Sequence, residues 1–496
     1  MERSPITKVT EESFIGKFTV LRGAVRELWL IFGTKILTII AYALVGTSTL
    51  GLWLSSDLGL NDQNAGIVIA SWSSALTIFT VMVGSLVDAI GIRKSLLAGF
   101  GLCVFARFVM SFFSAQWIAL PLGLLPLALG EALQTPVMVA AVRRFSSTKQ
   151  RSIAFSIYYS MMNVGFAAAA WTFDKVRAGL GEYGHYAIPY TGIQISTYQT
   201  IILLGLLFTI PNLLITYFGL RAGVEVTDEG VKINQEVPKY PGEPFLSAFF
   251  LSCRDALNDW RRIFSSLWAQ PAFYRFLAFF GFVVFVKLIL YHMYYTFPKF
   301  AIRELGLGAP IGHIFALLNA VIVIILAPVV GALTQRFSAY KAVVIGTAIT
   351  AVSVFFMAAP PALFQGLADG WLGNLIGHTW LGLTGPVHPL YVAIVLCVVM
   401  YSIGESFYSP RLYEYPAAIA PKGQEGSYMA LSMLPYFVAK FFVGSISGFL
   451  LVRYCPAEGP RHSQTLWLIV GVMALISPLG LIACRRYIQL HEAGRD

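Results

Sequence analysis

Six ionisable side chains lie inside long apolar stretches of this sequence. On insertion scales, each such charge at the centre of a membrane helix costs about 2.5–3.5 kcal/mol, so these residues usually pair with one another or line a water-filled cavity. A carboxylate in that setting can take up and release a proton, and a cation can attract an anionic group. The six residues are Lys35, Arg107, Glu131, Lys287, Glu405 and Lys440.

Polar aromatic and amide side chains accompany two of these stretches. Such side chains could hydrogen-bond and stack against a small amphipathic solute, but aromatic residues near helix ends are just as often anchors at the membrane surface. Both interpretations stay open for the tyrosines of 291–295, and the amide at 163 could instead bridge two helices. The residues are Tyr158, Tyr159, Asn163, Tyr291, Tyr294 and Tyr295.

The elements that must position these side chains are membrane-spanning helices. Of the 496 residues 57% are apolar and only 12% are charged, and the mean hydropathy is +0.70. A soluble domain carries about 25% charged residues, so we predict a polytopic membrane protein. Hydropathy predicts twelve helices, near residues 27–54, 64–88, 95–113, 117–142, 152–172, 200–219, 274–298, 310–335, 341–360, 387–410, 427–452 and 465–485.

The predicted helices form two sets of six, separated by a polar stretch whose prolines, glycines and charges are typical of a linker. Within it, apolar residues recur at helical spacing over 245–268. This pattern predicts an amphipathic helix that lies on the membrane or, equally, packs against the bundle. The predicted regions are a tail at 1–26, a six-helix half at 27–219, the linker at 220–272, a second half at 273–488 and a tail at 489–496.

The net charge of +10 reflects membrane topology and does not indicate nucleic-acid binding. Of the 35 Lys and Arg residues, 25 lie in tails and loops on one predicted side and six on the other. The positive-inside rule then places both termini in the cytoplasm. We expect a plasma-membrane protein, and the absence of Asn-x-Ser/Thr sequons suits a bacterial source and therefore a bacterial inner membrane.

A loop motif follows the second predicted helix and returns after the eighth. The first copy reads Gly84-Ser-Leu-Val-Asp88-Ala-Ile-Gly-Ile-Arg93, and the second runs from Gly331 to Lys341. This loop resembles the G-x-L-x-D-x-x-G-x-[RK] pattern of the major facilitator superfamily. The resemblance implies an all-α fold of twelve transmembrane helices in two pseudo-symmetric six-helix halves. It also suggests a gate formed with Asp88 and Arg93, although Arg93 could simply enforce the topology.

Two further stretches resemble the proton-dependent oligopeptide transporters. In the fifth helix Phe155-Ser-Ile-Tyr-Tyr-Ser-Met-Met-Asn163-Val-Gly is similar to that family's F-S-I-F-Y-x-x-I-N-x-G. In the tenth, Gly404-Glu405-Ser-Phe-Tyr-Ser-Pro410 is similar to its helix-ten motif. The resemblance implies transport of short peptides driven by a proton gradient.

The first helix departs from that family. Where the family carries E-x-x-E-R-F, with acids and an arginine that couple protons to peptide binding, this chain reads Glu27-Leu-Trp-Leu-Ile-Phe32. The family's lysine before the helix-four proline is replaced by Thr135. Lys35 could supply positive charge from another position, so a non-peptide anion is nearly as strong a candidate substrate as a peptide.

The superfamily fold places the first helix of each three-helix repeat at a central cavity. By this resemblance Lys35, Glu131, Lys287 and Glu405 line the cavity, whereas Arg107 could simply satisfy Glu131 or backbone carbonyls. Lys440 could reach the cavity mouth or pair with Glu405. We expect proton coupling at Glu405 and Glu131, and substrate binding at Lys35, Tyr158, Asn163, Lys287 and Tyr291.

These features predict a secondary transporter and not an enzyme. It would symport protons with a small zwitterionic or anionic solute such as a short peptide, using the proton gradient and no cofactor. The absence of a phosphate-binding loop argues against an ATP-driven pump. The alternatives are a facilitator or exporter of a non-peptide anion, or a membrane scaffold or sensor that kept the fold. The sequence identifies no protein partner beyond the small-molecule substrate and the lipid bilayer.

Overall fold

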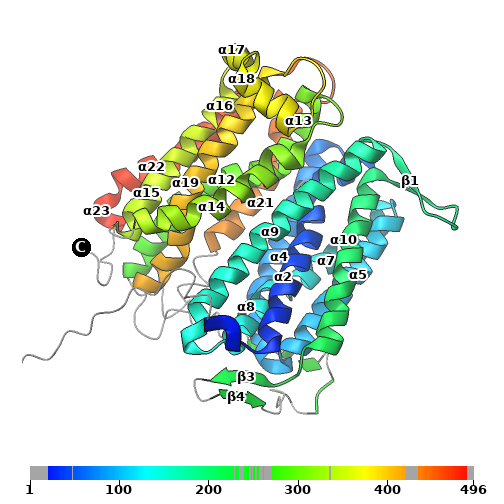
Figure 1. The fold of residues 1–496 in the computed structure, drawn as a ribbon, viewed down its shortest axis with the longest axis vertical. Helices are drawn as coiled ribbons and strands as arrows, with labels where there is room; N and C mark the ends of the chain where they lie inside the picture. The colour runs from blue at the N-terminus through cyan, green and yellow to red at the C-terminus, as the bar shows by residue number, and fades with distance from the viewer. Residues whose placement is uncertain are drawn as a thin grey trace, which may run out of the picture.

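Every one of the twelve predicted membrane segments contains a helix in the structure, which is a computed structural model (Figure 1). It describes residues 20–488 except 47–48, 228–229, 234–239, 335–336, 420–433 and scattered positions within 241–270. In a bilayer no water satisfies exposed backbone groups, so apolar runs fold as helices. Among the described residues, eight helices are long and apolar enough to cross a membrane. The other four predicted segments form α4 (Asp62–Ile90), α9 (Thr148–Leu180), α14 (Leu318–Leu333) and α21 (Leu434–Tyr454).

The first six segments form one half of the molecule. Besides α4 and α9, its elements are η1 (Val20–Gly23), α2 (Arg26–Gly46), α3 (Thr49–Ser56), α5 (Ile92–Phe112), α6 (Gln116–Ile118), η2 (Ala119–Leu124), α7 (Leu125–Ala132), α8 (Thr135–Arg144), α10 (Thr197–Leu214) and η3 (Ile215–Gly219). Helix α2 packs against α9 and α10, and α5 packs against α7 and α10. This packing brings the charged residues of segments one, three and four into one interior.

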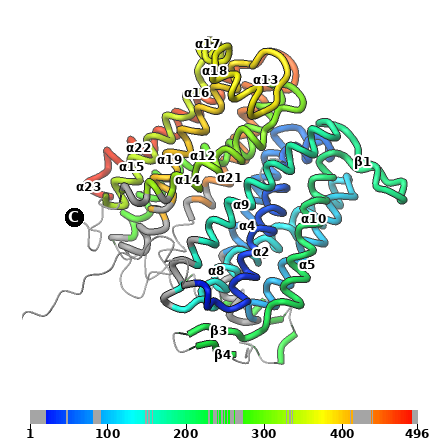
Figure 2. The backbone as a smooth tube through the Cα atoms, viewed as in Figure 1, coloured from blue at the N-terminus to red at the C-terminus, as the bar shows by residue number. Residues whose placement is uncertain are grey.

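The second half repeats this plan. Besides α14 and α21, its elements are α12 (Pro271–Tyr295), α13 (Phe297–Leu305), η4 (Gly312–Leu317), α15 (Ala339–Ser353), α16 (Phe355–Ala358), α19 (Pro389–Ile419), α22 (Ser463–Ala483) and α23 (Arg485–Ile488). Helix α19 packs against α14 and α15, and α12 packs against α21 and α22. In Figure 2 the two halves lie side by side, with the blue-to-green half next to the green-to-red half.

Two of the predicted spans are interrupted beside charged residues. Segment four passes through the π-helix η2, and its helix α7 ends directly after Glu131; α8 then starts with Pro136 in its first turn. Segment seven is interrupted at Thr296, between α12 and α13, where Pro298 follows. Proline lacks the N–H that a continuous helix needs, and such breaks are tolerated in membranes where neighbouring groups satisfy the backbone.

The structure adds elements that hydropathy does not predict. The loop after α9 is a hairpin of β1 (His185–Ala187) and β2 (Gln194–Ser196), and the predicted linker contains a second hairpin of β3 (Val224–Thr227) and β4 (Gly230–Ile233). The loop after α16 folds into the short helices η5 (Pro361–Phe364), α17 (Gln365–Ala368), α18 (Trp371–Gly373) and η6 (Asn374–Trp380). The predicted amphipathic helix at 245–268 lies largely outside the described residues.

The two halves pack closely where α4 meets α21. Glycines make this approach possible, because small residues let membrane helices come into backbone contact. A Cβ atom on Gly66 would lie 2.5 Å from the carbonyl oxygen of Gly444, and one on Gly448 would lie 2.6 Å from that of Asp62. These contacts lie near the end of the bundle that carries α13 and β1. The charge distribution predicts that this end faces outside, and we call it the outer end.

Candidate functional site

A buried ion pair joins segments three and four inside the first half. The Arg107 guanidinium on α5 pairs with the Glu131 carboxylate on α7, and Arg107 also donates a hydrogen bond of 3.0 Å to Thr209 on α10. Both charged side chains are almost fully buried. The structure therefore confirms the interpretation that Arg107 satisfies Glu131.

Lys35 is the third charge of this cluster. Its ammonium group lies 4.7 Å from the centre of the Tyr158 ring, a cation–π contact between α2 and α9, and it interacts electrostatically with Glu131. Only 1% of Lys35 is exposed. Asn163, one turn along α9, donates to the Tyr159 carbonyl of its own helix. We call Lys35, Arg107, Glu131 and Tyr158 the first-half cluster; it holds two cations and one acid.

A second charged pair lies in the second half. The Lys287 ammonium on α12 is 3.8 Å from a Glu405 carboxylate oxygen on α19 and donates a hydrogen bond of 3.1 Å to Ser409. It also lies over the Tyr408 ring, 4.7 Å from the centre. Both charged side chains are 13% exposed, more than those of the first-half cluster. The expected opposition of Lys287 and Glu405 is therefore present.

Asn319 is a site residue that the sequence reasoning missed. From α14 its amide donates to the other Glu405 oxygen and to Ser402, each over 3.0 Å. Thus Lys287 and Asn319 hold the Glu405 carboxylate from two sides. The available signal was that Asn319 is the one side chain with a hydrogen-bonding group in the otherwise apolar run of α14.

The tyrosines at the end of α12 lie inside the molecule. Tyr291 and Tyr295 are buried and stacked with ring centres 6.5 Å apart, and Tyr295 shares a hydrogen bond of 2.9 Å with Ser73 on α4. The Lys440 ammonium on α21 is 5.8 Å from the centre of the Tyr291 ring. This burial agrees with an interior position and not with an anchor at the membrane surface. Lys440 thus stands beside Tyr291, at the boundary between the halves.

Ion pairs fasten the halves together at the outer end, and these were not foreseen. Asp62 at the start of α4 accepts from Lys299 (2.7 Å) and Arg303 (2.6 Å) on α13. Asp174 on α9 accepts from the ring (2.5 Å) and the backbone N–H (2.6 Å) of His313, which belongs to η4. The hydrogen bonds described between the halves include that of Ser73 with Tyr295 and those of Asp62 and Asp174 at the outer end. These contacts close the end of the bundle that we call the outer end.

The gate expected from the loop motif is only partly within the described structure. Arg93 donates 2.6 Å to the Tyr217 carbonyl of η3 and lies over the Tyr217 ring. The side chain of Asp88 lies outside the described residues, so the pairing of Asp88 stays a prediction. Glu27, which remains from the family's first-helix motif, is fully buried and binds Arg221 at 2.5 Å.

The close contact at Gly66 predicts a shift in conformation. Gly66→Ala places a methyl group against the backbone of α21, and overpacking costs about 1–3 kcal/mol. We expect this cost to open the outer end. A cysteine introduced at Ser73, which is 2% exposed in the closed structure, should then react about tenfold faster with a maleimide. A tenfold change corresponds to about 1.4 kcal/mol, which lies within the expected cost. Gly281→Ala on α12 is the control, because nothing lies within 4 Å of its Cβ position. Equal rates in the two variants would contradict the prediction.

The arrangement is that of a carrier with a charged cluster in each half and a closed outer end. Among the described residues, no group of three His, Cys, Asp or Glu side chains could hold a metal ion. A family model described as Major Facilitator Superfamily matches residues 31–376, more than half of the chain. The chain therefore belongs to the major facilitator superfamily, and it is a membrane transporter and not an enzyme.

Solved structures of proton-dependent oligopeptide transporters (the POT family) share its fold. One from a study of substrate recognition in these transporters has a TM-score of 0.64 and 16% identity over 93% of this chain and 98% of that chain. A POT family transporter in complex with 5-aminolevulinic acid has a TM-score of 0.68 and 14% identity, over 97% and 98%. A POT peptide transporter in complex with alafosfalin has a TM-score of 0.65 and 18% identity, over 93% and 94%. Curated proteins give no significant sequence match.

Proposed function

We propose that this transporter symports protons with a small zwitterionic or anionic solute, such as a short peptide, by alternating access. The observation that carries the proposal is the partly exposed pair of Lys287 and Glu405, 3.8 Å apart. Protonation of Glu405 removes the charge that attracts Lys287. Lys287 is then available to a carboxylate of the solute, so that proton binding and solute binding favour one another.

The first-half cluster supports an anionic or zwitterionic solute. Lys35 and Arg107 face the single carboxylate of Glu131, so the cluster retains one positive charge in excess. Lys287 supplies another cation in the second half, and Lys440 lies beside Tyr291. Two of the structural neighbours were solved in complex with small molecules, 5-aminolevulinic acid and alafosfalin.

The contacts at the outer end support the proposal of alternating access. Asp62 and Asp174 connect the first half to α13 and η4 of the second, and a solute arriving from outside requires these contacts to break. Each contact joins a side chain from one half to a partner from the other, so the halves can separate as rigid bodies. The broken contacts re-form when the opposite side opens.

The function is tested with purified protein in proteoliposomes. We expect dialanine, or failing that a small organic anion, to accumulate when the outside is made acidic, and an added protonophore to abolish accumulation. The same ligand at 100 times its dissociation constant adds about 2.7 kcal/mol to stability, which a melting curve detects. Accumulation without dependence on the gradient would indicate a facilitator, export driven by the gradient would indicate an antiporter, and no binding or transport of any compound would favour a scaffold or sensor.

We also propose that the protein lies in the plasma membrane with both termini in the cytoplasm. The excess of Lys and Arg in the tails and in alternate loops supports this orientation. A green fluorescent protein fused after Asp496 should then fluoresce in bacteria, whereas alkaline phosphatase at the same position should be inactive. The same pair of fusions within 185–196, in the loop that contains β1 and β2, should give the opposite result.

A further inference from the structure

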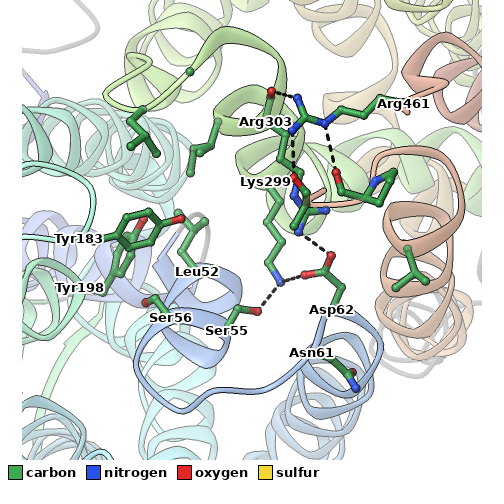
Figure 3. Close-up of a pocket in the computed structure, with 16 residues that line it drawn as sticks. Leu52, Ser55, Ser56, Asn61, Asp62, Tyr183, Tyr198, Lys299, Arg303 and Arg461 are labelled. Carbon is green, nitrogen blue, oxygen red and sulfur yellow. Dashed lines mark hydrogen bonds and ion pairs between the residues drawn. The ribbon is translucent and has the colours of Figure 1, made fainter. Parts of the chain in front are cut away.

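A cleft of about 620 Å³ lies between the two halves at the outer end (Figure 3). Neither Glu131 nor Glu405, the residues expected to couple protons, lines it. One wall comes from α3, the start of α4 and Tyr198 of α10. The other comes from α13 and from the loop that carries Arg461. Its volume falls within the range of about 300–1,000 Å³ that is usual for small-molecule sites.

The walls of this outer cleft carry three cations and one acid. Lys299 and Arg303 share the single carboxylate of Asp62, one on each oxygen. Arg461 is held by backbone carbonyls, donating to Pro456 (3.2 Å) and to Ala457 (3.1 Å). Figure 3 shows Lys299, Arg303 and Arg461 on one wall, with Asp62 reaching toward the first two. The cleft therefore has an excess of positive charge.

Glu182 and Glu304, two carboxylates close to the cleft, are not among the residues that line it. Glu182 pairs with Arg177 and accepts from Tyr198. Glu304 accepts from Ser463 over 2.5 Å. Lys299 is also only 4% exposed, and a cation that is largely removed from water binds a carboxylate more strongly than a solvated one does.

The chemistry of these walls suits the carboxylate of a small solute. An arginine presents a planar fork that matches a carboxylate with two hydrogen bonds, and Lys299 adds a third donor beside it. Ser55, which accepts from Lys299 over 2.6 Å, and Tyr183 on the facing wall offer polar groups to the rest of the solute.

We propose that the outer cleft captures the carboxylate of a small solute, and that this carboxylate replaces Asp62 as the counter-ion of Lys299 and Arg303. Those two ion pairs fasten α13 of the second half to α4 of the first. Replacing Asp62 therefore releases the halves from one another at the outer end. That the captured solute is also the transported solute rests on the function proposed above. The binding of a carboxylate in the cleft does not depend on that function.

The test uses purified full-length protein in lipid nanodiscs, with no proton gradient and with acetate as the probe. A cysteine introduced at Leu307, which lines the cleft and is 67% exposed, reports occupancy through its reaction with the neutral reagent N-ethylmaleimide. A cysteine at Leu363, 71% exposed in the loop after α16, is the matched control. Sodium chloride at equal ionic strength corrects for screening, and the parent chain gives the background of native cysteines.

We expect acetate to slow the reaction at position 307 and not at 363. The measured quantity is the acetate concentration that gives half of the full protection at position 307. Asp62→Asn should lower this concentration about tenfold, and Lys299→Gln or Arg303→Gln should raise it about tenfold. Each factor corresponds to ~1.4 kcal/mol. A gain of affinity in Asp62→Asn cannot come from misfolding. Acetate should also speed the reaction of a cysteine introduced at Ser73, where the halves touch.

Three results would overturn the proposal. Absence of protection in both the parent and Asp62→Asn rules out the carboxylate site. Protection that is unchanged in Lys299→Gln and Arg303→Gln places the ligand elsewhere. Protection at 307 without any change at Ser73 rules out the release of the halves. Since the assay measures binding alone, a protein that binds acetate here but fails to accumulate solute would contradict the proposed transport and leave the cleft assignment standing.

Discussion

Glu405→Gln should reduce acid-driven uptake to the level of empty liposomes, while exchange of labelled for unlabelled solute across the membrane continues. The glutamine keeps the hydrogen bond with Asn319, which is 3.0 Å from the carboxylate oxygen, but it can neither bind the coupling proton nor attract Lys287. The permanently neutral side chain corresponds to the protonated carrier. This carrier can bind solute and reorient while loaded, but it cannot return after releasing a proton.

Glu458→Gln is the matched control, since Glu458 is an exposed acid in the loop after α21. It removes the same charge at a distance from the bundle interior, and we expect uptake at the parent rate. Uptake and exchange are measured in the same proteoliposomes, so that loss of both would indicate a damaged protein. Acid-driven uptake that survives in Glu405→Gln would show that another group couples the proton.

The sequence predicts the helical spans well because membrane helices are determined by one strong local signal, the length of an apolar run. The same signal does not reveal how a run is interrupted. Segment four was predicted as a single helix over 117–142, whereas the structure divides it around η2 and again after Glu131. Neither the hairpin of β3 and β4 nor the short helices after α16 could be predicted, because their side-chain patterns are too short for a period to emerge.

The candidate site was predicted unevenly for a similar reason. Charges inside apolar runs stand out, so Glu131 and Glu405 were identified together with Arg107 and Lys287. Asn319 carries no charge and was overlooked, although it binds Glu405 directly. Asp62 and Lys299 lie at helix ends, where charges are common, so their sequence positions gave no indication that the fold brings them together across the two halves.

Glu131→Gln should destabilise the folded protein more than any other single change in the first-half cluster. Removing one partner of a buried ion pair costs about 3–5 kcal/mol, because the remaining charge is left without compensation. Glutamine here leaves Arg107 and Lys35 as two buried cations with no acid between them. By contrast, Arg107→Gln leaves Glu131 opposite Lys35, which can still neutralise it. We therefore expect the melting temperature to fall further in Glu131→Gln than in Arg107→Gln.

The double variant separates a structural role of this pair from a role in coupling. Replacing both charges by Gln keeps the single positive charge of Lys35, so the stability lost in Glu131→Gln should largely return. If Glu131 only neutralises Arg107, the double variant also regains acid-driven uptake. If Glu131 carries a coupling proton, stability returns but uptake does not. Equal melting temperatures in the parent and Glu131→Gln would contradict the buried pair itself, because an accessible pair contributes only about 0–1 kcal/mol.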